Sequence, residues 1–280
     1  MRLSPDLLSG LLRKPAPRPK LPTSRERAAT NRLRVLQAVA DHGHLRCADL
    51  AAACWPGARF GEQMAQRTVR ALVTSGDLKA RANCHGGLSY VLTRLGAAAL
   101  EVRGTGAHHG LDLASVRGPT FTHHALTSRW CLHMQGQGFQ AFHEYAVASG
   151  RAPVTTEQLL RRYGKVCDAV LIKGDQLWLA ETEAAPKSTQ ELMRIAGLAE
   201  HVGRRVHPDL PFVLAGVHIV FNAEQNHAAR IAKAARERWQ RYTAAQKHTL
   251  AGRITLNRVS LGLPLVWRGC TDEPLSLKAI

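Results

Sequence analysis

The sequence predicts a mixed α/β protein made of a helical N-terminal part and a larger C-terminal α/β part. Three helical patterns followed by two short extended runs occupy residues 28–103. A hairpin pattern over 165–183 and a near-continuous apolar run over 212–221 alternate with helical patterns further along. We therefore expect one domain over 28–103 and an α/β domain over 121–270, joined by a linker over 104–120.

Both ends of the chain are expected to lie outside these domains. Residues 1–27 are rich in proline, arginine and lysine, a composition that predicts a flexible basic arm, and residues 271–280 are predicted to form a polar tail. The sequence has no apolar run of about 20 residues, so no membrane span is expected. The six cysteines form no C-x-x-C pair, which favours reduced thiols and a cytoplasmic location.

The charge of the chain indicates its partner. The formal net charge is +17, and residues 1–103 contain 17 Lys and Arg against seven Asp and Glu. Such an excess creates a field that attracts polyanions. Double-stranded DNA is therefore the expected partner.

The N-terminal domain has the element order of a winged helix-turn-helix. Apolar residues recur at helical spacing from Ala28 until His42-Gly43 interrupts them, and later segments repeat the pattern. The expected elements are helices over 28–42, 47–54 and 61–74, then strands over 78–82 and 88–92. Three helices followed by a hairpin predict a fold that places its third helix in the major groove.

The third helix and the hairpin carry outward side chains that suit phosphates and base edges. The candidate DNA-binding residues are Arg59, Gln63, Gln66, Arg67, Arg70, Lys79 and Arg81. The alternative is a solvated basic face on a winged helix that binds proteins.

The candidate catalytic residues of the C-terminal part lie on or next to a predicted hairpin. Its strands are expected over 165–172 and 176–183, on either side of a Lys173-Gly174-Asp175 turn. Because side chains alternate across a strand, Glu181 and Glu183 share an apolar face, and Asp168 lies on an apolar face of the other strand. Burying carboxylates there is costly unless they are paired or coordinate a cation. Two interpretations stay open: the acidic strand ends fray into solvent, or the carboxylates hold Mg²⁺.

The other predicted elements surround this hairpin. They are an amphipathic helix over 121–137 that packs between the domains, a strand or irregular edge over 138–147, long helices over 191–206 and 223–246, and edge strands over 254–261 and 265–268. His123 and His124 are expected to be surface or interface residues of the first helix.

Asp168, the hairpin, and Glu181-Thr182-Glu183 followed by a helical pattern resemble the core of restriction-endonuclease-like, PD-(D/E)xK, nucleases. The resemblance implies a metal site in which Asp168 and Glu181 bind Mg²⁺. This chain departs from the motif because Glu183 stands where the family has a lysine. Lys187, or Lys165, is the candidate for a displaced ammonium. In an endonuclease, Glu183 would be a further ligand or general base and Lys187 would orient water.

A second resemblance spans roughly residues 30–245. The predicted wing ends in Tyr90-Val91-Leu92-Thr93-Arg94-Leu95-Gly96, a His-containing helix follows, and then come Asp168-Ala169 and Glu181-x-Glu183. This order is similar to the plasmid replication-relaxation family. The resemblance implies DNA binding in plasmid replication, relaxation or mobilisation. Replication or conjugation proteins and a second copy of the chain are further candidate partners.

Three functions therefore stay open at this stage. The first is a DNA-binding protein of a mobile element whose nuclease-like domain serves DNA or partner contacts. The second is a metal-dependent DNA endonuclease or nickase. The third is a winged-helix transcriptional regulator whose C-terminal domain only dimerises.

Overall fold

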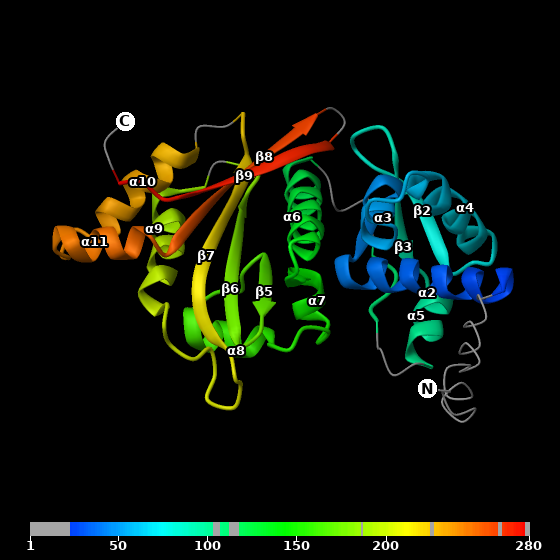
Figure 1. Ribbon diagram of the computed structural model, residues 1–280, viewed down its shortest axis with the longest axis horizontal. Coiled ribbons are helices and arrows are strands. Elements are labelled where there is room, and N and C mark those ends of the chain that lie inside the picture. Colours follow the sequence, from blue (N-terminus) through cyan, green and yellow to red (C-terminus); the bar gives the residue numbers. More distant parts are fainter. Residues whose placement is uncertain are drawn as a thin grey trace, which may run out of the picture.

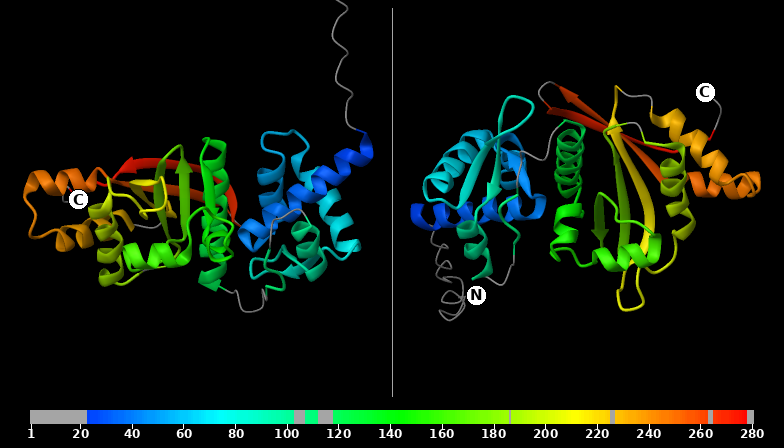
Figure 2. Two further views of the ribbon diagram at one scale, coloured as in Figure 1. Left: turned by 90° about the horizontal axis from the view of Figure 1, so that it is seen from below. Right: turned by 180° about the vertical axis from the view of Figure 1, so that it is seen from behind.

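The computed structural model describes residues 23–102, 107–111, 118–185, 187–224, 227–262 and 265–277, which form a mixed α/β structure. The N-terminal elements and the large C-terminal sheet lie at opposite ends of the molecule (Figure 1). Helix α6 (Gly118–Gly136) lies between them in every view (Figures 1 and 2). Most of the expected arm and linker falls outside the described residues.

The N-terminal elements are α2 (Ser24–His42), β1 (His44–Arg46), α3 (Cys47–Cys54), α4 (Gly61–Thr74), β2 (Leu78–Ala82), β3 (Leu88–Leu92) and α5 (Arg94–Glu101). The strands pair antiparallel in the order β1-β3-β2. Strand β1 was not predicted. Helix α2 begins before the expected Ala28 because Thr23 and Glu26 form a capping box, which satisfies free amides of its first turn. The expected arm boundary at residue 27 therefore lies inside a helix.

Helix α4 has one apolar face and one polar face. Ala65, Val69 and Leu72 are buried against α2 and α3, at the spacing of one helix face. The residues between them are exposed, apart from the half-buried Thr68. The buried stripe therefore determines which side chains α4 offers to a partner.

The C-terminal elements after α6 are β4 (Gln140–His143), α7 (Glu144–Ala148), α8 (Thr156–Tyr163), β5 (Ala169–Lys173), β6 (Gln176–Glu183), α9 (Thr189–Gly197), a 3₁₀ turn (Leu198–His201), β7 (Val213–Asn222), α10 (His227–Arg238), α11 (Ala244–Ala251), β8 (Ile254–Gly262) and β9 (Val266–Pro274). In the described residues they form a six-stranded sheet in the order β4-β5-β6-β7-β8-β9. Strands β6, β7 and β8 run parallel, and the other neighbours are antiparallel.

Helices cover both faces of this sheet. On one face, Leu126 and Trp130 of α6 pack against β5, β6, β7 and β8. On the other face, α9 and α10 bury Ile195 and Ile231 against residues of β6 and β7 such as Leu179. Because β7 is covered on both sides, it reads as a continuous apolar run in the sequence.

Several predicted boundaries were wrong. The helix expected over 191–206 ends at Gly197 and continues only as a 3₁₀ turn. The helix expected over 223–246 is two helices, because Thr243 caps a new one, α11, with Gln246. Strand β9 extends to Pro274, so the expected tail at 271 begins within the sheet.

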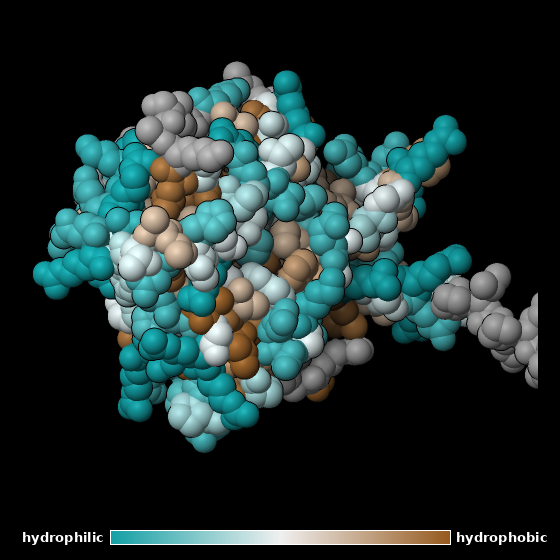
Figure 3. Space-filling view, turned by 60° about the vertical axis from the view of Figure 1, so that its left-hand side comes forward, coloured by the Kyte–Doolittle hydropathy of each residue, from teal (hydrophilic) through white to brown (hydrophobic). Residues whose placement is uncertain are grey.

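The exterior of the protein is largely polar, and its thiols lie both in the core and at the surface. Figure 3 brings the α10–α11 side forward and shows hydrophilic surface broken by small apolar patches. Within the described ranges, no helix is both long and apolar enough to cross a bilayer. The six cysteines are free thiols; Cys54, Cys131 and Cys167 are buried and Cys84 is exposed.

Four histidines meet between the N-terminal elements and the C-terminal part. The rings of His44 and His124 stack with centroids 3.8 Å apart, and His143 lies 4.4 Å from His124 and 5.5 Å from His42. His124 Nε2 lies 2.6 Å from the carbonyl oxygen of His42 and donates to it, and His42 Nδ1 lies 3.1 Å from Ser128 Oγ. We call these four residues the histidine stack. Burial lowers the pKa of His42 and His44 to about 4, so their rings are neutral at pH 7.

Replacing His44 with phenylalanine should stabilise the protein. Neither ring nitrogen of His44 has a hydrogen-bond partner among the described residues, and Phe121 stacks on its ring at 5.2 Å. A phenyl ring keeps the stacking and removes unsatisfied buried nitrogens, which we expect to add about 1 kcal/mol to the free energy of unfolding at pH 7. Urea denaturation measures this change.

The free energy of unfolding of the same variant should depend less on pH than that of the wild type. The folded pKa of His44 lies below its ordinary value, so the unfolded chain takes up more protons as pH falls from about 6.5 toward 4, and stability is lost there. We expect His44→Phe to lose less stability than the wild type between pH 7 and pH 5. The exposed His248→Phe is the control; equal losses in both variants and the wild type would contradict the prediction.

Candidate functional site

Asp168 and Glu181 converge at one edge of the large sheet. Asp168 immediately precedes β5, and the antiparallel register that pairs Ala169 with Ala180 continues to place Asp168 opposite Glu181. The backbone amide of Thr182 donates to Asp168 Oδ2 at 2.7 Å. The local hairpin thus places the two residues opposite each other, which the sequence alone left open.

Glu181 and Glu183 are both buried. They follow Leu177 and Leu179 on the face of β6 that points to α9 and α10, and both are 0% exposed. The interpretation of a frayed acidic strand end is therefore wrong. Two buried carboxylates on one strand require cations close by.

Two lysines provide that positive charge. Lys187 Nζ lies 2.8 Å from Glu183 Oε1 and 3.5 Å from Glu181 Oε2, and it donates to the carbonyl oxygen of Thr182 at 3.3 Å. Lys165 Nζ forms an ion pair with the same Glu181 oxygen. Lys187 and Lys165, the two candidates for a displaced ammonium, thus share one carboxylate. Glu181 Oε1 is buried and has no hydrogen-bond partner in the described part of the chain.

The pKa values of Asp168, Glu181 and Glu183 are shifted in different directions. Burial raises the pKa of Glu183 to about 6, although Lys187 opposes the shift. Burial also raises the pKa of Glu181, and the charge of Asp168 adds to this effect. Burial alone would raise the pKa of Asp168, but hydrogen bonds and charges from His123, Lys187 and the Thr182 amide bring it below its ordinary value. Asp168 is thus the most firmly ionised of the three.

The structure adds His123 and Glu144 to this edge. His123 Nε2 lies 3.3 Å from Asp168 Oδ1, and the amide of Glu144 donates to the carbonyl oxygen of Asp168 at 2.8 Å. One ligand atom from each of the three side chains lies within 4.8 Å of the others. We call His123, Glu144 and Asp168 the triad. Glu181, which was expected to share a metal with Asp168, does not belong to it.

Sequence reasoning placed neither of the two added residues at the site. His123 was expected at the surface or at an interface, and Glu144 was counted within a strand or irregular edge. In the structure Glu144 begins α7, directly after β4, and β4 pairs with β5. A clue is available in the dipeptide His143-Glu144 at the end of a short strand pattern, but which strand neighbours β5 is a non-local choice.

The predicted DNA-binding residues lie on the surface of the N-terminal elements. All seven are exposed: Arg59, Gln63, Gln66, Arg67, Arg70, Lys79 and Arg81. Within the described residues, no carboxylate lies within 4.0 Å of the cationic groups of these side chains. Arg59 lies before α4, and its guanidinium stacks over Phe60 at 5.2 Å. This cationic surface is free to meet an anion.

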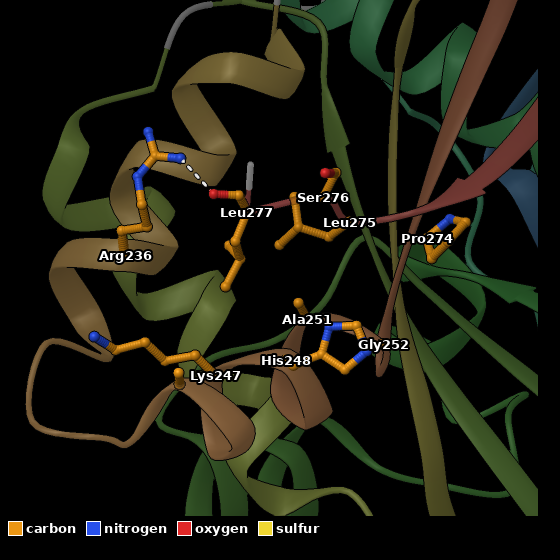
Figure 4. Close-up of a pocket in the computed structure, with 10 residues that line it drawn as sticks. Arg236, Lys247, His248, Ala251, Gly252, Pro274, Leu275, Ser276 and Leu277 are labelled. Carbon is orange, nitrogen blue, oxygen red and sulfur yellow. Dashed lines mark hydrogen bonds between the residues drawn. The ribbon is translucent and has the colours of Figure 1, made fainter. Parts of the chain in front are cut away.

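A cavity of about 700 Å³ lies between α10, α11 and the end of β9. Arg236 donates across it to the carbonyl oxygen of Leu277, and Lys247 and His248 flank its mouth (Figure 4). Its lining contains no carboxylate side chain among the described residues. The cavity is therefore separate from the acidic edge of the sheet and contributes nothing to its chemistry.

Comparisons of the chain with protein-family models, with curated proteins and with solved structures found no match.

Removing the Lys187 ammonium should destabilise the fold. Lys187→Met leaves Glu183 without its cation and Glu181 with one cation fewer in a buried setting. We expect a loss of about 3 kcal/mol in the free energy of unfolding at pH 8. The loss should shrink at pH 5, because Glu183, whose pKa is raised to about 6, is then protonated.

Urea denaturation at both pH values measures this loss. Lys233→Met, at an exposed position of α10, is the matched control and should change little. A loss at pH 5 as large as that at pH 8 would show that Lys187 acts through packing rather than through charge.

Proposed function

We propose that the protein binds duplex DNA and serves a mobile genetic element in plasmid replication, relaxation or mobilisation. The observation that carries the proposal is the exposed cationic surface of α4 and the β2–β3 hairpin, which includes Arg67, Arg70, Lys79 and Arg81 and has no carboxylate partner among the described residues. Cations without carboxylate partners are available to phosphates and release counterions when they bind them.

The arrangement of the N-terminal elements supports a winged helix as the DNA-binding module. Helices α2, α3 and α4 precede the β2–β3 hairpin, β1 between α2 and α3 completes a three-stranded sheet, and α4 turns its buried stripe inward. In this geometry α4 would read the major groove with Gln63, Gln66 and Arg67, and the hairpin would contact the flanking backbone. The assignment to a mobile element rests on the resemblance to the replication-relaxation family, whose motifs include Asp168-Ala169.

A metal-dependent endonuclease or nickase is the second candidate. The observation that favours it is the placement of Asp168 opposite Glu181, with Lys165 and Lys187 beside Glu181. A restriction-endonuclease-like core uses an Asp, a second acid and one lysine, although here Glu183 stands at the position of that lysine. Asp168 and Glu181 would hold Mg²⁺, which supplies a Lewis acid at a phosphate. Lys187 would orient the attacking water, and Glu183 would accept its proton.

The DNA-binding proposal is tested by removing two cations of α4. We expect Arg67→Ala/Arg70→Ala to weaken duplex binding about tenfold or more. The double variant should also reduce the slope of log affinity against log salt by about 0.9 for each lost phosphate contact. Fluorescence anisotropy of a labelled duplex across a salt series measures both quantities.

Arg241→Ala is the matched control, because Arg241 is exposed between α10 and α11, at the opposite end of the molecule from α4 (Figure 1). Wild-type affinity and salt slope in the double variant would overturn the proposed interface.

The endonuclease candidate is tested on supercoiled plasmid with Mg²⁺ or Mn²⁺. If it is correct, the wild type nicks or cuts the plasmid, and Asp168→Asn and Glu181→Gln abolish the reaction while duplex binding survives. The exposed Glu157→Gln should leave the reaction unchanged. Binding without any cutting by the wild type would refute the endonuclease and leave the DNA-binding proposal standing.

A further inference from the structure

We propose that His123, Glu144 and Asp168 form a site for a first-row divalent transition-metal ion such as Mn²⁺ or Zn²⁺. The site shares Asp168 with the Mg²⁺ pair expected from the sequence, but it uses a different set of ligands. It depends neither on DNA binding nor on cleavage.

The spacing of the triad suits a metal ion. Ligand atoms about 2.0–2.2 Å from one ion lie about 3–4 Å from each other, and the triad atoms lie within 4.8 Å, with His123 and Asp168 already 3.3 Å apart. The three side chains come from α6, from the start of α7 and from the residue before β5. His123 and Asp168 are 25% and 15% exposed, which leaves a path for an ion.

The backbone and neighbouring side chains hold the ligands in place. The Thr182 amide occupies Asp168 Oδ2, which leaves Oδ1 facing His123. The Glu144 amide is bonded to the Asp168 carbonyl, so these two residues move together. Thr127 donates to the carbonyl oxygen of His123 at 2.9 Å and also bonds to Thr182 Oγ1, which ties α6 to β6. Such outer contacts preorganise metal ligands.

The histidine stack adds a second constraint on the same two segments. His124 and His143 are the chain neighbours of His123 and Glu144, and both are buried in the stack. His124 donates to the His42 carbonyl, while His143 Nδ1 accepts from the Tyr145 amide at 3.1 Å. In each dipeptide one residue packs toward the N-terminal elements and the other lies beside Asp168. The docked N-terminal elements therefore help to position the triad.

The balance of charge around the triad supplies a second argument for a cation. Glu181 is 0% exposed, and its Oε1 has no hydrogen-bond partner in the described residues. The carboxylates outnumber the ammonium groups here, with Glu144, Asp168, Glu181 and Glu183 against Lys165 and Lys187. A divalent cation would relieve this excess.

The ligand types select the class of metal. Mg²⁺ prefers oxygen ligands and keeps several waters, whereas an imidazole nitrogen suits Zn²⁺ and the two carboxylates also suit Mn²⁺. His123 therefore favours a transition metal over Mg²⁺. Two carboxylates and one imidazole leave coordination positions open for water or for an anionic partner.

The experiment is a metal titration of the full chain. We expect one Mn²⁺ per chain by electron paramagnetic resonance and one Zn²⁺ by calorimetry, with Mg²⁺ a weak competitor. His123→Ala and Glu144→Gln should each weaken binding of both ions about tenfold or more. The exposed His248→Ala and Glu157→Gln are matched controls and should bind as the wild type does. Circular dichroism and urea denaturation confirm that each variant is folded.

Two results would overturn the site. One is wild-type affinity in folded His123→Ala and Glu144→Gln. The other is binding that survives His123→Ala but is lost in Glu181→Gln, which would place the ion on the Asp168 and Glu181 pair. Neither result bears on the proposed function, because the cationic surface of α4 is measured separately by duplex binding.

Discussion

The structure depends on the burial of helix α6 on two sides. Leu126 and Trp130 pack into the large sheet, and Phe121 and His124 turn toward the N-terminal elements. A helix covered in this way has no single apolar face, and its polar groups must be satisfied inside the protein. Trp130 Nε1 accordingly donates to Asn257 Oδ1 at 3.2 Å, and Thr127 bonds to β6. This one rigid helix therefore provides a residue of the acidic edge and also joins the N-terminal elements to the large sheet.

The acidic edge illustrates the competition between desolvation and ion pairing. Two glutamates lie on a face of β6 that is otherwise apolar, and burial penalises both charged forms. Lys187 lies beside both carboxylates and its own pKa is raised by them, although burial opposes the shift. Such a network stabilises a fold poorly compared with apolar residues of the same volume. Carboxyl groups with shifted pKa values that gather in one place are more typical of functional sites than of structural ones.

The local elements were largely predictable from the sequence. The boundaries expected for α3, α4, β2, β3 and β6 match the structure, because each segment has a clear hydrophobic period and a glycine or proline near its end. The break between α10 and α11 was missed, although Thr243 and Gln246 form a capping box that the sequence displays. Asp168 and Glu181 lie opposite each other because a hairpin is a local structure, whose turn determines the register.

The sequence by itself determined the helix faces, the hairpin and the charge of the surface, since these depend on residues a few positions apart. Only the tertiary structure decided that β4 pairs with β5, which brings Glu144 to Asp168, and that α6 lies across the sheet, which brings His123 there. It also decided that Glu183 is buried rather than frayed. These outcomes depend on contacts between segments 20 or more residues apart along the chain, such as His123 with Asp168. Bringing distant segments together costs loop-closure entropy, and burying their side chains against each other offsets that cost. No short sequence pattern encodes either quantity.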